Sequence, residues 1–130
     1  MTVLVSWTPG PVGEGALDVA IAEAQLRGTR VVVVNATKGD SLVDTRFDHH
    51  LDDGPVGQRL KESGVDHEVV QELGDDPVEV ILDVLRRVEA ELLVVGLRRR
   101  TPVGKLILGS TSQRLLLDSP IPVLAVKPPK

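Results

Sequence analysis

The 130-residue chain contains no cysteine and no tyrosine, and it has only one tryptophan and one phenylalanine. The absence of cysteine excludes disulfide bonds and thiolate metal sites. Because aromatic residues make up only 2% of the sequence, the core must be built from valine, leucine, isoleucine and alanine. Such an aliphatic, β-branched inventory is typical of strands that are covered on both faces of a parallel sheet.

The sequence also lacks long apolar runs and an excess of basic residues. Its apolar stretches are far shorter than the about 20 residues needed to span a bilayer. No basic segment precedes the apolar run that ends at Trp7, so nothing there predicts a signal peptide. We therefore expect a soluble, cytoplasmic protein with no membrane partner. The net charge of −4 disfavours nucleic acid as a partner, because that affinity comes mainly from neutralised phosphates.

Apolar runs and helical periodicities alternate along the chain, and the length favours one domain over residues 1–130. The predicted strands are 3–7, 31–36, 66–73, 92–96 and 123–126. The predicted helices are 14–27, 56–63, 77–90 and 110–119. This order predicts a flavodoxin/Rossmann-like α/β fold, with an open, five-stranded, mostly parallel sheet and helices on both faces. Residues 97–104 are expected to form a loop.

Several residues mark the ends of these helices. Gly28 and Gly64 directly follow helical segments, where a left-handed glycine commonly ends a helix. Asp76 followed by Pro77 is typical of a helix start, which explains the acidic pair that Asp76 forms with its neighbour better than acid chemistry does. Ser110 to Gln113 fits a capping box.

In an open parallel sheet, ligands bind beyond the carboxyl ends of the strands. The loops to inspect are those after Trp7, Ala36 and Gly96. The last of these carries four cationic side chains and leads to a glycine, three hydroxyls and a predicted helix start. Free amides and the helix dipole at that start predict an anion site. The alternative is that Ser110 only caps the helix and that the glycines only form turns.

Three standard motifs of nucleotide-binding and hydrolase sites are not matched by this sequence. A Walker A loop ending at Lys105 would need glycine at Arg99 and a hydroxyl residue at Leu106. A GxGxxG motif starting at Gly13 has Asp18 in place of its third glycine. No GxSxG elbow exists, and no general base or activated nucleophile can be recognised, so no catalytic residue is predicted. An ATPase or phosphotransferase that uses the Ser110 hydroxyl is therefore the weakest of the functional hypotheses considered for this chain.

Other polar residues are better explained without chemistry. Adjacent side chains such as His49 and His50 point in different directions, so no metal site is predicted there. Trp7 at a strand end could stack on a base, but filling the edge of the core is favoured. The run Arg98 to Arg100 could dock an acidic protein or RNA, but no aromatic platform lies near it in the sequence.

The chain resembles the universal stress protein family. That family has glycine, two residues, glycine, nine residues, then glycine with Ser or Thr between its fourth strand and last helix. Gly96 matches the first glycine and Gly109-Ser110 the final pair. The family ending is matched by 122–127 (PVLAVK), and its opening by Ala16-Leu17 and 25–28 (QLRG). The likeness covers essentially the whole chain and is weakest over 38–64.

The resemblance implies an adenine-nucleotide site, with ATP, ADP or AMP and accompanying Mg²⁺. It implies that Ala36 offers main-chain groups to adenine, that the loop after Gly96 wraps ribose and phosphates, and that the start of the last helix grips the phosphates. The candidate cofactor-binding residues are therefore Thr8, Ala36, Gly96, Arg98, Arg99, Gly109, Ser110 and Thr111.

Two of these positions depart from the family. Thr8 stands where an Asp is common, and a hydroxyl cannot act as an anionic acceptor. Arg99 replaces the second glycine, so it either blocks the backbone from the phosphates or replaces an amide contact with a charge contact.

We therefore expect a stress-response regulatory protein that binds ATP with Mg²⁺ around residues 96–112 and lacks efficient catalysis. The alternative is a nucleotide-independent interaction or scaffold module. The resemblance implies in both cases a homodimer formed through the final strand, Val123 to Val126.

Overall fold

The computed structural model describes residues 1–37, 54–100 and 105–128, and it describes the backbone alone at residues 37, 99, 100, 105 and 106. In chain order the elements are β1 (Thr2–Ser6), α1 (Pro11–Arg27), β2 (Arg30–Thr37), α2 (Pro55–Ser63), β3 (His67–Leu73), α3 (Pro77–Arg87), β4 (Ala90–Gly96), β5 (Arg98–Arg100), β6 (Lys105–Ile107), α4 (Ser110–Asp118) and β7 (Val123–Val126).

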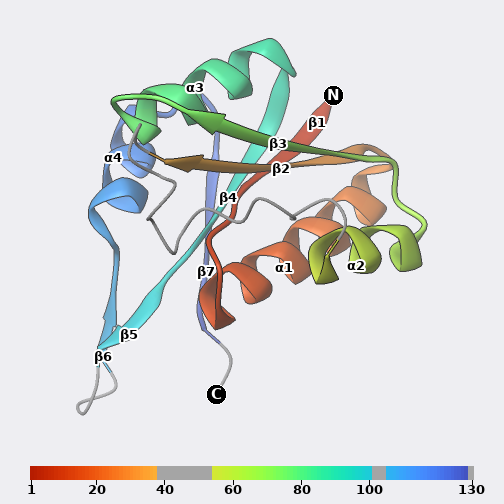
Figure 1. Cartoon of the computed structure of the whole chain (residues 1–130), viewed down its shortest axis with the longest axis horizontal. Coiled ribbons are helices and arrows are strands. Elements are labelled where there is room, and N and C mark those ends of the chain that lie inside the picture. Colours follow the sequence, from red (N-terminus) through yellow and green to blue (C-terminus); the bar gives the residue numbers. More distant parts are fainter. Residues whose placement is uncertain (38–53, 101–104, 129–130) are drawn as a thin grey trace.

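The main sheet has five parallel strands in the order β3-β2-β1-β4-β7 (Figure 1). This confirms the predicted α/β fold with an open five-stranded sheet. Numbered along the chain, the main-sheet order is 3-2-1-4-5, which is the Rossmann order without a sixth strand rather than the flavodoxin order. The order changes direction between β1 and β4. That switch point is where a ligand crevice is expected.

The sheet is covered on both faces, which explains the unbroken valine runs of the inner strands. Val3 and Val5 of β1 point to the face covered by α1 and α2, where they meet Leu17 and Leu60. Leu4 points to the other face, covered by α3 and α4 (Figure 1).

Helix ends follow the predicted local chemistry in three cases. Gly28 and Gly64 adopt left-handed conformations, with φ of 65° and 73°, after α1 and α2. Asp76 caps α3 by accepting a hydrogen bond from the Val78 amide at 3.1 Å. At the end of α3, however, Glu89 takes a positive φ of 53°, a conformation that usually favours glycine.

Two predictions are corrected. Residues 97–104 were expected to form a loop, but β5 and β6 pair as an antiparallel hairpin in which Arg98 faces Ile107. Three consecutive arginines lack the apolar alternation by which a strand is recognised. Helix α1 begins at Pro11 rather than Glu14, because proline suits the first helical position although it also resembles a loop residue.

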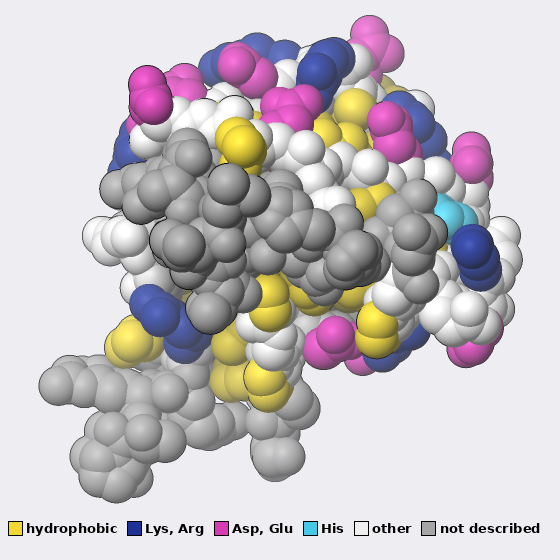
Figure 2. All heavy atoms as spheres, viewed as in Figure 1, with side chains coloured by type: hydrophobic (Ala, Val, Ile, Leu, Met, Phe, Trp, Pro, Cys, Tyr) yellow, Lys and Arg dark blue, Asp and Glu magenta, His cyan; other side chains and the backbone are white. Residues whose placement is uncertain are grey.

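The surface visible in Figure 2 shows acidic and basic side chains interspersed over α3 rather than gathered by sign. Within the described residues, no helix has both the length and the apolar character to cross a membrane.

Candidate functional site

A cavity of about 310 Å³ opens at the carboxyl edge of the sheet, at the switch point between β1 and β4. It is called here the carboxyl-edge cavity. Its lining residues are Ser6, Trp7, Thr8, Pro9, Val12, Ala36, Pro77, Ile81, Gly96, Arg98, Gly109, Ser110, Thr111 and Ser112. Seven of the eight predicted binding residues are among them. The side chain of the eighth, Arg99, lies outside the described part of the structure.

The end of β1 forms one wall. The Trp7 amide donates a hydrogen bond to the Val34 carbonyl at 2.9 Å, which extends the pairing of β1 with β2. The Trp7 indole is 4% exposed and packs in the core between the sheet and α1, as favoured from the sequence. Thr8 and Pro9 follow on the exposed rim.

Glycines let this wall close tightly. A Cβ atom on Gly96 would lie 2.5 Å from the Val12 side chain and 2.9 Å from the Val12 carbonyl oxygen. A Cβ atom on Gly13 would collide with the Thr8 carbonyl oxygen. Glycine at these positions therefore allows the start of α1 to pack directly against the ends of β1 and β4.

The start of α4 forms the opposite wall, and here the capping prediction is wrong. The N-cap is Gly109, in an extended conformation, and no side chain in the described part of the chain caps the helix. Ser110 is the first helical residue, and the first helical bond runs from the Gln113 amide to the Gly109 carbonyl at 2.8 Å. Because glycine has no side-chain acceptor, the first-turn amides of Ser110 to Ser112 receive no cap from it.

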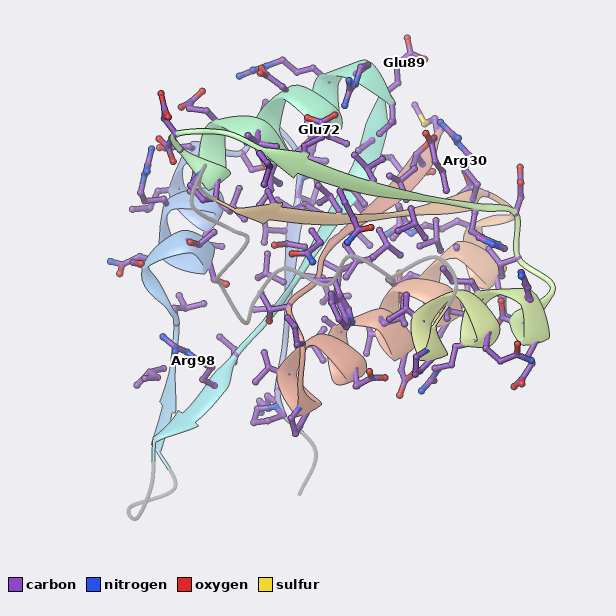
Figure 3. All side chains as sticks on the ribbon, in the orientation of Figure 1. Arg30, Glu72, Glu89 and Arg98 are labelled. Carbon is purple, nitrogen blue, oxygen red and sulfur yellow. The ribbon has the colours of Figure 1, made fainter. Side chains whose placement is uncertain are left out.

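Arg98 adds a positive charge to this helix start. A Cβ atom on Gly109 would lie 3.0 Å from Arg98 Nη2 and 3.5 Å from its Cζ, so the guanidinium lies against the Gly109 backbone. Figure 3 shows Arg98 just below the start of α4. The helix dipole and the guanidinium both favour an anion at this point.

Helix α3 contributes Pro77 and Ile81 to the cavity. Directly before Pro77, Asp76 accepts two hydrogen bonds from Arg114 of α4, each at 3.0 Å. The Arg114 guanidinium, with help from the Val78 amide, holds the pKa of the Asp76 carboxyl below its ordinary value. This confirms that Asp76 is a capping residue, and it shows a partner that the sequence did not reveal.

Polar side chains also lie buried beside the cavity. Asn35 of β2 is aligned with Gln71 of β3, and it follows Val34, the partner of Ser6. Trp7 Nε1, both amide atoms of Asn35 and Gln71 Nε2 are buried without a hydrogen-bond partner in the described structure.

Acidic or histidine clusters that could hold a metal are not found among the described residues. The pair His49 and His50 lies outside those residues. Three cavity residues on α1 and α3 were not predicted from the sequence, because their apolar side chains carry no chemical signal: Val12, Pro77 and Ile81.

The family model described as "Universal stress protein family" matches residues 1–127. A universal stress protein from Mycolicibacterium smegmatis is 47% identical over 126 residues, covering 97% of both chains. The solved universal stress protein of Archaeoglobus fulgidus superposes with a TM-score of 0.81 at 28% identity, covering 98% of both chains.

Some solved relatives of this fold are nucleotide complexes. A universal stress protein from A. fulgidus in complex with dAMP has a TM-score of 0.75 at 24% identity, covering 98% of both chains. An Arabidopsis thaliana family protein with AMP bound has a TM-score of 0.72 at 20% identity, covering 99% of this chain and 92% of that one. The fold, the glycine positions and the family match agree, and this chain belongs to the universal stress protein family.

Proposed function

We propose that this chain binds an adenine nucleotide in the carboxyl-edge cavity and acts as a stress-response regulatory protein without efficient catalysis. The observation that carries the proposal is the uncapped start of α4, with the Arg98 guanidinium lying against its N-cap glycine. A volume of about 310 Å³ lies at the lower end of the range of small-ligand sites. The solved relatives that contain dAMP and AMP support an adenine ligand.

The phosphates would lie at α4. The amides of Ser110, Thr111 and Ser112 supply donors that the helix leaves unpaired, and the hydroxyls of the same residues supply more. Arg98 supplies a charge that offsets the phosphate. The proposed grip therefore combines a helix dipole with one guanidinium, whereas the family signature relies on glycine backbone.

The nucleoside would lie toward β1 and β2. Ala36 lines the cavity at the end of β2, where main-chain groups are available to a base, and Trp7 forms part of the adjoining wall. Thr8 offers a hydroxyl to the ribose in place of the family's carboxylate. Because a neutral hydroxyl binds a sugar less strongly than a carboxylate does, we expect the phosphate contacts to dominate affinity.

ATP with Mg²⁺ is the proposed physiological ligand. No described residue that lines the cavity is an Asp or Glu, so the metal would be held by phosphate oxygens and water, with the Ser110 or Thr111 hydroxyl as the available protein ligands. The same described lining contains no His, Lys or Cys, which supports slow or absent turnover rather than a positioned acid–base pair.

Isothermal titration calorimetry at low salt tests the proposal, with ATP, ADP, AMP and adenosine as ligands and with and without Mg²⁺. We expect the phosphorylated ligands to bind more tightly than adenosine, and added salt to weaken them selectively. If none of the three nucleotides binds, the proposal is rejected.

The second candidate is a nucleotide-independent dimeric interaction module. The supporting observation is that β7 is an edge strand of the described sheet, is uncharged, and follows a helix on which Leu117 is 74% exposed. Light scattering after size exclusion at micromolar concentration decides this candidate, because a monodisperse monomer contradicts it. A dimer that binds no nucleotide would favour it over the first proposal.

A further inference from the structure

Helix α4 presents the proposed phosphate site, yet few side chains anchor it. Leu115 is its one buried residue, whereas α3 buries five and α1 six. Leu116 and Leu117 are 43% and 74% exposed. One apolar anchor fixes a point on the helix but leaves its direction poorly determined, so a second contact is needed to aim its N-terminal amides.

That second contact is the pair formed by Arg114 and Asp76. Arg114 Nη1 and Nη2 each donate to a separate oxygen of Asp76, both at 3.0 Å. Two parallel bonds between a planar guanidinium and a planar carboxylate fix orientation as well as distance. The neighbouring ion pair Arg86–Asp83 lacks this geometry, because it has one bond of 3.4 Å within α3.

Both ends of the pair lead to the carboxyl-edge cavity. Asp76 caps α3 through the Val78 amide, and the next residue, Pro77, lines the cavity. Arg114 lies four residues, about one helical turn, beyond Ser110, which lines it from the other side. Neither Asp76 nor Arg114 lines the cavity itself, so they do not belong to the proposed ligand contacts.

We infer that Arg114 and Asp76 are positioning residues that hold the start of α4 at the distance from α3 that phosphate binding requires. The inference rests on the proposed function, which it deepens by naming what orients the phosphate-binding amides. Loss of the paired geometry lets α4 tilt about Leu115 and moves the first-turn amides away from the phosphate, while the nucleoside side of the cavity keeps its walls of β1 and β2.

Charge alone is a competing explanation, because Arg114 also neutralises a carboxylate close to an anion site. Arg114→Lys separates the two explanations: lysine keeps the positive charge but cannot form the two parallel bonds. Asp76→Asn keeps an acceptor for the Val78 amide but loses the ion pair. Arg86→Lys is the matched control, since it makes the same change in an ion pair outside the cavity lining.

The test measures the affinities of the full-length wild type and the three variants for AMP and for adenosine. We expect Arg114→Lys and Asp76→Asn to weaken AMP binding about threefold to tenfold, with adenosine affinity changed less than about twofold and Arg86→Lys without effect on either. A general loss of structure would weaken both ligands equally, and that result overturns the inference. Unchanged AMP binding by Arg114→Lys also overturns it.

Hydrogen–deuterium exchange of the ligand-free proteins gives an independent readout. Arg114→Lys should speed exchange in the first turn of α4 and leave the amides of α1 unchanged. If the wild-type protein binds no AMP, the proposed function is rejected. The positioning role is then tested by hydrogen–deuterium exchange in α4 alone. Equal α4 exchange in wild type and Arg114→Lys would reject that role.

Discussion

The two helices that form opposite walls of the carboxyl-edge cavity differ in how many side chains they bury in the core. Helix α1 buries Ala16, Leu17, Ala20, Ile21 and Ala24 against β1 and β4, and its first turn is locked to the strand ends by Gly13 and Gly96. Helix α4 buries Leu115 and depends on a polar pair for its direction. Low burial generally accompanies easier local opening, so the phosphate side of the cavity should be the adjustable side.

Core truncation gives the largest expected effect. Leu17→Ala in α1 removes a fully buried side chain and should lower the free energy of unfolding by about 3 kcal/mol. Leu117→Ala in α4 should change it by less than about 0.5 kcal/mol, since that side chain is 74% exposed. Urea denaturation of both variants provides the measurement. Equal losses would mean that the two walls are anchored alike.

Removing the guanidinium at the helix start should affect binding more than folding. Arg98→Gln is expected to weaken AMP binding about tenfold, equivalent to about 1.4 kcal/mol, with little change for adenosine. Trp7 fluorescence offers a readout, since the only tryptophan lines the cavity. Arg86→Gln serves as the control. A wild-type-like AMP affinity for Arg98→Gln would remove this residue from the proposed site.

At the opposite edge of the sheet, one substitution should stabilise. Glu89 has φ of 53°, so Glu89→Gly should raise the free energy of unfolding by about 0.5–1 kcal/mol by relieving the left-handed backbone. Thermal unfolding measures the gain, and Glu89→Ala, which keeps a Cβ atom, should not reproduce it. Ligand affinity should stay unchanged, because Glu89 does not line the cavity.

The smallest expected effect concerns pH. The folded protein holds the Asp76 pKa below its ordinary value, chiefly through Arg114. The ion pair therefore contributes its full stabilisation to the folded state above the pKa of Asp76 in the unfolded chain. This contribution is lost as the pH falls through the pKa of Asp76 in the folded protein. Asp76→Asn should be less stable than wild type at pH 7, and the gap should close from about pH 4 downward. Denaturation at several pH values measures it; a gap independent of pH would contradict the assignment.

Most of the fold could be predicted because certain residues indicate the local structure directly. Gly28, Gly64 and the Asp76-Pro77 step marked helix ends, and the valine runs marked doubly covered strands. The glycines and hydroxyls of the candidate site could also be predicted, because the order of strands and helices places them at the carboxyl edge of the sheet. The family resemblance added the expected ligand, which local chemistry alone left open.

What escaped prediction depends on contacts between distant residues. Asp76 and Arg114 are 38 positions apart, and no local pattern links them. The Arg98 guanidinium lies against Gly109 because β5 pairs with β6. That pairing was not predicted, because a run of arginines does not indicate a strand. The capping prediction at Ser110 failed because Gly109 can itself adopt the extended N-cap conformation, which moved the helix start one residue earlier.

All five main strands run in one direction, and this has a practical consequence for handling the protein. Met1 precedes β1 at the amino edge, whereas Lys127 follows β7 at the same edge as the cavity. A purification tag or surface linker attached before Met1 would project away from the opening. An addition after residue 130, three positions beyond Lys127, would be tethered to the edge that carries the cavity, so immobilised binding assays on this chain should be anchored through the first residue.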